Sequence, residues 1–198
     1  MRNLLTFKVE IEGLENKIWR NIEIPERRTL ADLAYTILAT FDSLAYHLFK
    51  IKYSGHEFRS GVSGESHDTE YSSANAVDFK LRDLRMKEND TMDMEYDFGS
   101  PTTFKITYLG SKKLSIYEEY LYPSIVDGSG RGMLDDITDY ELQEIIEDID
   151  KKGYSEHLVT PGYGKNEIYD YRDFHIDLNN EKLKGLILQI KNGYEVED

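Results

Sequence analysis

The chain has 198 residues, no cysteine and a formal net charge of −14, concentrated in residues 111–198, where 20 acidic residues stand against 10 basic ones. A hydrophobic content of 39%, with 15 Tyr and 8 Phe, excludes a disordered chain, and this length is sufficient to bury a core. The lack of cysteine excludes disulfides, thiolate nucleophiles and cysteine-ligated metal sites, and the acidic balance disfavours direct binding to nucleic acid.

The first residues predict no signal peptide, because Lys8 and Glu10 interrupt a short apolar run. No stretch reaches the roughly 18 apolar residues that a membrane span requires. We therefore expect a soluble, cytoplasmic protein folded as one α+β domain over residues 1–198. Within it we expect a hairpin-helix-strand core over residues 1–110 and an acidic helical extension packed on that core over residues 111–198.

The opening of the chain predicts a β-hairpin followed by a helix. Alternating apolar residues predict strands near 4–11 and 17–24, and Pro25 ends the second because it has no N–H for the ladder. Thr29 is a typical N-cap, and the apolar residues behind it recur at helical spacing. We expect a helix near 30–41 with one stripe facing the core.

Three further strands are expected near 47–53, 91–98 and 103–109, with a Ser- and Gly-rich loop over 60–77. In the strand near 91–98, Met92, Met94, Tyr96 and Phe98 share one face. Asp97, Phe98 and Gly99 match the Asp-Phe-Gly tripeptide of protein kinases, but no Gly-rich loop, strand lysine or His-Arg-Asp accompanies it. The tripeptide is therefore interpreted as part of a hairpin turn.

Two helices are expected in the second half. Thr138 and Glu141 form a capping-box pattern ahead of an apolar stripe, and Gly153 follows as a stop, so a helix is predicted near 139–150. A second apolar stripe predicts a helix near 180–191. Gly185 interrupts this stripe and weakens the helix by roughly 1 kcal/mol relative to alanine.

Four segments, in this order, resemble the plasmid pRiA4b ORF-3-like family: KIWRNIEIPERRTLADL, HLFKI, LRDLRMKENDTMDMEYDFG and YPSIVDGSGRGMLDDITDYEL. The resemblance covers about residues 4–150 and has a looser echo in RDFHIDLNNEKL. It implies a mixed sheet of about five strands in a ubiquitin-like (β-grasp) arrangement, with helices added at the C-terminal side. It also implies an association with mobile elements, and it implies a fold more strongly than a function.

The chain departs from the family's pattern at the Tyr-Asp-Phe-Gly motif, which is Tyr96 to Gly99 here. The family continues with an acid, a Trp and a His, whereas this chain has Ser100 after the motif and Lys105 near the place of the His. We therefore expect any polar site built from this motif to lack several family groups.

Candidate binding residues come from the segments that carry the resemblance, because loops held by a scaffold gather binding groups. We expect Asp97, Asp136 and His47 within about 10 Å of one another, close enough for a shared ligand or a bridging water. The full set of candidates is His47, Asp97, Asp127, Asp135 and Asp136, with Trp19 and Arg20 as a second, strand-borne pair.

The leading functional hypothesis is a non-catalytic binding or protein-interaction module with no cofactor, because no nucleophile, base or complete metal-binding motif stands in the sequence. One alternative is a metal-dependent enzyme that uses Asp97, Asp127, Asp135 and Asp136 with His47. Another is an acidic partner, or mimic of nucleic acid, in a nucleic-acid system.

Overall fold

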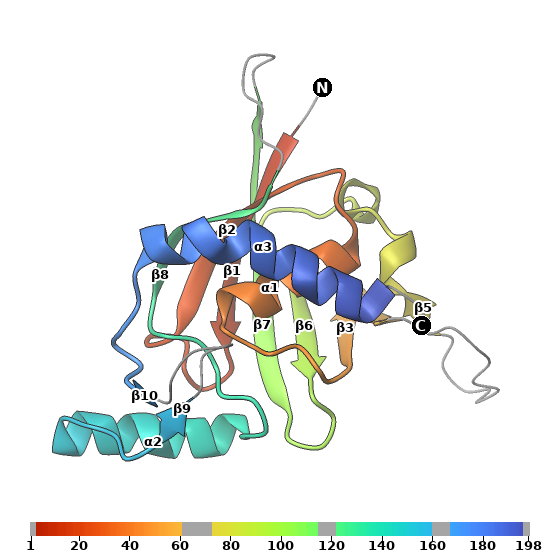
Figure 1. Ribbon diagram of the computed structural model, residues 1–198. Coiled ribbons are helices and arrows are strands. Elements are labelled where there is room, and N and C mark those ends of the chain that lie inside the picture. The colour runs from red at the N-terminus through yellow and green to blue at the C-terminus, as the bar shows by residue number, and fades with distance from the viewer. Residues whose placement is uncertain (1–2, 61–72, 115–121, 160–166, 196–198) are drawn as a thin grey trace.

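The computed structural model describes residues 3–60, 73–114, 122–159 and 167–195 (Figure 1). Most of the strands form one sheet in the order β5-β4-β3-β6-β7-β1-β2-β8, in which each neighbouring pair is antiparallel except β4 and β5. Their bounds are β1 Asn3–Ile11, β2 Trp19–Pro25, β3 Phe49–Tyr53, β4 His56–Arg59, β5 Ala74–Asn75, β6 Thr91–Tyr96, β7 Thr102–Lys113 and β8 Ser124–Ser129. A separate two-stranded ribbon contains β9 (Leu158–Val159) and β10 (Glu167–Ile168).

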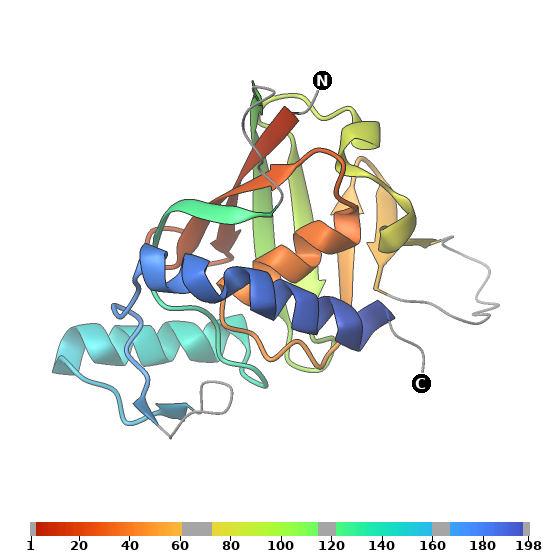
Figure 2. The ribbon, with the colours of Figure 1, turned by 45° about the horizontal axis from the view of Figure 1, so that its top comes forward.

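Two helices cover one face of the large sheet. α1 (Leu30–Thr40) lies against the strands, and α3 (Ile176–Glu195) crosses over α1, as Figure 2 shows. α2 (Asp139–Lys152) lies apart from them, near the β1–β2 turn, where the Gln143 amide contacts the Glu12 carbonyl and Lys17 pairs with Asp150. Two 3₁₀ turns, η1 (Ala76–Asp78) and η2 (Leu81–Leu84), connect β5 to β6.

The predicted sheet of about five strands in a ubiquitin-like arrangement is wrong, because the large sheet has eight strands. Strands were found at all five predicted places, and β4, β5 and β8 add to the edges. β8 comes from residues expected to form a helical extension, and it pairs with β2. These added strands are short, and their apolar and polar residues alternate little. They form because their backbone groups pair with the free backbone groups of the neighbouring strand at the sheet edge.

Helix ends follow the predicted caps. Thr138 and Glu141 form the reciprocal capping box of α2, and Gly153 ends that helix with a φ of 86°. Thr29 caps α1, with Asp32 completing its box. The expectation of a single buried stripe on α1 is wrong, because every residue of α1 is buried. α3 covers the side of α1 that the sheet leaves open, and its Lys191 reaches Asp32 at 2.9 Å.

The core lies between the sheet and the two helices. Met92, Met94 and Tyr96 all point into it, as predicted, but Phe98 does not, because it lies in the turn after β6 and is 47% exposed. Within the described ranges, no helix combines the length and apolar character needed to cross a membrane. Of the loop expected over 60–77, residues 61–72 lie outside the described part of the chain.

Candidate functional site

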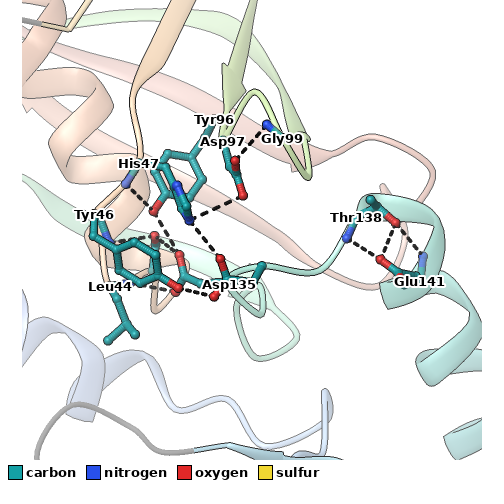
Figure 3. Close-up of polar contacts among 12 residues, drawn as sticks. Leu44, Tyr46, His47, Tyr96, Asp97, Gly99, Asp135, Thr138 and Glu141 are labelled. Atoms are coloured by element: carbon teal, nitrogen blue, oxygen red, sulfur yellow. Dashed lines mark hydrogen bonds and ion pairs between the residues drawn. The ribbon is translucent and has the colours of Figure 1, made fainter.

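Three segments far apart in the sequence meet at one end of the sheet (Figure 3). They are the loop after α1, the turn after β6 and the approach to α2. Backbone hydrogen bonds join them, from Met133 N to the Phe41 carbonyl at 2.8 Å and from Asp97 N to the Leu48 carbonyl at 3.1 Å. The strand predicted to begin at His47 begins at Phe49, so His47 belongs to the loop.

His47 stands between two carboxylates at this junction. Its Nε2 lies 2.9 Å from Asp136 Oδ1 and 3.5 Å from Asp97 Oδ2. One ligand atom from each of the three residues lies within 4.8 Å of the other two. The expected proximity of these residues is therefore met, well inside 10 Å, whereas their role in binding stays a prediction.

Asp135 holds the three segments in place. Its carboxylate accepts hydrogen bonds from the Ser43 hydroxyl at 2.8 Å, from Leu44 N at 2.8 Å and from the Tyr96 hydroxyl at 3.0 Å. The buried Tyr96 hydroxyl also accepts from His47 N at 3.4 Å. Because its oxygens are engaged in this way, Asp135 positions the site rather than lining it.

Strained backbone is concentrated at this junction. Four residues other than glycine have φ between 56° and 63° there: Asp42, Ala45, Asp97 and Asp136. Such left-handed positions cost about 1–2 kcal/mol for most L-residues, although Asp tolerates them better than most. Strain of this kind persists where surrounding contacts over-determine it, and it clusters at functional sites.

Tyr46 acts on Asp136 directly. Its hydroxyl donates to Asp136 Oδ2 while His47 meets Oδ1, and these two contacts, the Tyr46 bond first, lower the pKa of Asp136. Burial and the bond to Asp136 raise the pKa of Tyr46. Asp136 is therefore ionised and Tyr46 protonated at neutral pH.

The C-terminal helix reaches the site through Tyr194, whose hydroxyl donates to the His47 carbonyl. The Tyr194 ring stacks on Tyr35 of α1 at 5.3 Å and meets Phe49 edge-on. His47 is thus fixed from the backbone side by α3 as well as by the sheet.

Exposed apolar side chains occur in the same loops. Leu44, Tyr46 and Leu48 are 55%, 53% and 55% exposed, and Phe98 lies in the turn beside Asp97. Large apolar side chains that are exposed beside a polar cluster such as His47 and Asp97 can contact a ligand or a partner protein.

Asp127 is not part of the group around His47. It lies on the edge strand β8 opposite Asn21, and its carboxylate accepts from its neighbour Gly128 N at 2.9 Å. Among the described residues, the cluster with metal-ligand spacing contains His47, Asp97 and Asp136.

Trp19 and Arg20 point to opposite faces of β2 and make no joint surface. Trp19 faces away from the helices, with the Lys8 ammonium over its ring at 5.6 Å. Arg20 is fully buried and donates to the carbonyls of Thr40, Trp19 and Ser129. Burial lowers the pKa of Arg20 to about 9, and its guanidinium stacks on Phe174 at 3.7 Å. Arg20 is a structural residue that joins β2, α1 and β8.

Sequence reasoning missed the two tyrosines of the site. Tyr96 belongs to the Tyr-Asp-Phe-Gly motif and shares a face with core residues, but it is not among the candidate binding residues, and neither is Tyr46, which directly precedes His47. The sequence signal that could have identified both tyrosines was their position next to His47 and Asp97. The hydrophobic periodicity gives no such signal, because it does not depend on whether a core side chain ends in a hydroxyl.

A family model described as plasmid pRiA4b ORF-3-like protein matches residues 3–178 of the chain. The fold is similar to the crystal structure of a protein of unknown function from Methanosarcina mazei Go1, with a TM-score of 0.65 and 22% sequence identity. That similarity covers 96% of this chain and 90% of the other, and at this identity it shows the fold alone. No curated protein matches the chain.

Proposed function

The chain belongs to the plasmid pRiA4b ORF-3-like family, and we propose that this member binds a divalent metal ion through His47, Asp97 and Asp136. The resemblance seen in the sequence is thereby confirmed, but it assigns no activity. One observation supports metal binding above the others: an imidazole nitrogen and two carboxylate oxygens from three separate segments lie within 4.8 Å of one another.

The separations suit a shared ion. Two ligand atoms bound to one ion by bonds of about 2.1 Å lie roughly 3.0 Å apart at a right angle and 3.4 Å apart at a tetrahedral angle. His47 Nε2 lies 2.9 Å and 3.5 Å from the two carboxylates. The two carboxylate oxygens lie within 4.8 Å of each other, so sharing one ion requires them to be no farther apart than this bound.

The charge balance also favours a cation. Asp97 is buried, and among the described residues its carboxylate contacts only Gly99 N, at 2.9 Å, and His47. A buried carboxylate without a full counter-charge is unfavourable. As metal ligands, one neutral imidazole and two carboxylates carry a combined charge of −2, which a divalent ion neutralises.

The ligand types favour Zn²⁺ and Mn²⁺ over the alkaline-earth ions. Imidazole suits zinc and other transition metals, whereas Ca²⁺ and Mg²⁺ prefer a shell of oxygen ligands. Three protein ligands leave positions open for water or a further ligand.

A protein partner is the second candidate function. The exposed Leu44, Tyr46, Leu48 and Phe98 favour it, because apolar side chains around a polar centre are typical of interaction surfaces. This candidate corresponds to a binding module without a metal, and the test below separates the two.

Thermal unfolding of metal-free protein tests metal binding, with Zn²⁺, Mn²⁺, Mg²⁺ and Ca²⁺ added separately. At 100 times its dissociation constant an ion that binds only the folded state stabilises it by about 2.7 kcal/mol. For a chain of this length we expect a rise in Tm of roughly 5–10 °C with Zn²⁺ or Mn²⁺.

His47→Ala, Asp97→Asn and Asp136→Asn should each remove most of this rise. Asparagine tolerates the left-handed backbone of the two aspartates, so these variants should fold. The matched controls are His175→Ala, which removes an exposed histidine 3.3 Å from Asp173, and Asp93→Asn, which removes an exposed carboxylate. If no ion raises Tm, or if the controls lose the rise as fully as the site variants, the metal site is rejected and the protein partner becomes the leading candidate.

A further inference from the structure

A concave site lies at the edge of the sheet opposite β8. It is an open groove of about 700 Å³ between the end of the β3–β4 hairpin and the segment that runs from η1 to β6. Its volume falls within the range of small-molecule sites, about 300–1,000 Å³. None of the three residues of the proposed metal site lines it.

The floor of the groove is aromatic. Phe58 of β4 is buried and meets Phe79 edge to face, with ring centroids 4.9 Å apart. Tyr53 and Leu84, both half-buried, continue this apolar surface. Flat apolar ligands gain both burial and ring contacts on such a floor.

The carboxylates at the rim are already engaged. Asp90 accepts hydrogen bonds from the Tyr53 hydroxyl at 2.8 Å and from Lys87 N at 2.9 Å. Glu57 pairs with Arg59 at 2.7 Å, and Asp83 lies 3.5 Å from Arg82. Arg59 and Arg82 thus partly offset the charges of Glu57 and Asp83, whereas the two groups that donate to Asp90 are uncharged and leave its carboxylate negative.

Two basic groups also line the rim. Within the described part of the chain, the Arg85 guanidinium and the Lys87 ammonium form no hydrogen bond or salt bridge, and both side chains are exposed. The backbone N–H of Lys87 and, to a smaller extent, its ammonium charge lower the pKa of Asp90. Arg85 also has a φ of 52° at the end of η2. A left-handed arginine costs about 1–2 kcal/mol, and strained residues are enriched in ligand sites.

We propose that this groove binds a small aromatic anion, with the flat apolar body on Phe58 and Phe79 and the anionic group between Arg85 and Lys87. A guanidinium and an ammonium both bind carboxylate, sulfonate or phosphate oxygens, and the guanidinium of Arg can form a bidentate pair of hydrogen bonds with them. The site is independent of the proposed metal site, so either one can fail without the other.

Titration of ¹⁵N-labelled protein with 2-naphthoate, followed by amide chemical shifts, tests this binding. We expect shifts confined to residues 53–58 and 79–90, with a dissociation constant below about 1 mM. The matched cation 2-naphthylmethylammonium should bind at least about tenfold more weakly, because it presents the opposite charge to Arg85 and Lys87.

Arg85→Gln and Lys87→Gln should each weaken 2-naphthoate binding several-fold. Arg27→Gln is the control, because Arg27 is an exposed arginine that does not line the groove. No shift with 2-naphthoate, equal affinity for the cationic analogue, or equal loss in the Arg27 variant would each overturn the assignment. The comparison of the two ligands needs no variant, so it stands even if a substituted protein fails to fold.

Discussion

Single residues at the candidate site have unusual backbone, and one of them is also a buried acid. Asp97 is a buried acid with a φ of 59°, and Asp136 has a φ of 63° at the end of the loop that leads toward α2. Periodic patterns do not encode either property. Each follows from contacts with other segments, such as the Leu48 carbonyl and the Tyr46 hydroxyl.

Asp139, the first residue of α2, has a carboxylate that is only half satisfied. Its Oδ2 accepts from Thr103 N at 2.9 Å, whereas its buried Oδ1 has no hydrogen-bond partner among the described residues. Burial, with a smaller effect from the charge of Glu12, raises the pKa of Asp139 to about 7.

This raised pKa makes stability depend on pH. The carboxyl titrates near pH 4 in the unfolded chain and near pH 7 in the folded protein, so the folded state is favoured while the group is protonated. The free energy of unfolding should therefore fall between about pH 4 and pH 7 because of this group. Asp139→Asn removes the titration and should gain about 1 kcal/mol over the wild type between pH 5 and pH 8, allowing for partial exposure of the site.

Urea unfolding of both proteins across this pH range measures the difference. Asp93→Asn, which changes an exposed carboxylate, should stay parallel to the wild type. Parallel curves for Asp139→Asn would show that Asp139 titrates normally.

At the scale of elements, the site depends on a close approach between the end of α1 and the segment before α2. A Cβ on Gly132 would lie 1.9 Å from the Phe41 carbonyl oxygen, and the Gly132 carbonyl accepts from the Tyr169 hydroxyl at 2.9 Å. Gly132 therefore lets the Asp135–Asp136 segment reach His47.

Two glycine substitutions should have opposite effects. Gly132→Ala forces backbone apart and should lower the free energy of unfolding by at least about 2 kcal/mol. Gly185→Ala lies in the middle of α3 with no atom within 4 Å of its added Cβ, so it should raise stability by about 1 kcal/mol. Chemical denaturation measures both, and a harmless Gly132→Ala would contradict the close approach.

At the scale of the whole molecule, one sheet joins both halves of the chain. β1 and β7 are neighbouring interior strands, whereas β8 and β5 form its edges. The two halves are further linked by Lys191 of α3 with Asp32 of α1 and by Arg20 with the Ser129 carbonyl.

Hydrogen exchange should follow this arrangement. Amides of β1 and β7 that bond across the sheet should be protected at least about 100-fold more than those of β5, because opening free energies range from near zero at edges to the global value in the core. Exchange followed by mass spectrometry or NMR measures the protection. Equal protection in β5 and β7 would be inconsistent with the strand order.

The sequence by itself determined the local elements. The strands β1 and β6 were predicted from the alternation of apolar residues, and α2 from its apolar stripe and its capping box with Thr138 and Glu141. These patterns depend only on local backbone geometry and on the burial of one face. The family resemblance, rather than periodicity, led to the pairing of His47 with Asp97 and Asp136, because it marked the segments that carry them.

Only the tertiary structure decided the rest. The edge strands β4, β5 and β8 depend on backbone hydrogen bonds that almost any side chain permits, so their short sequences did not predict eight strands. The complete burial of α1 required α3 to pack over it, and the place of Arg20 on the inner face required carbonyls from three segments. Only the tertiary structure showed that Asp127 lies outside the group around His47 and that Tyr46 and Tyr96 belong to it. Packing, and not local sequence pattern, sets the distances between residues far apart in sequence.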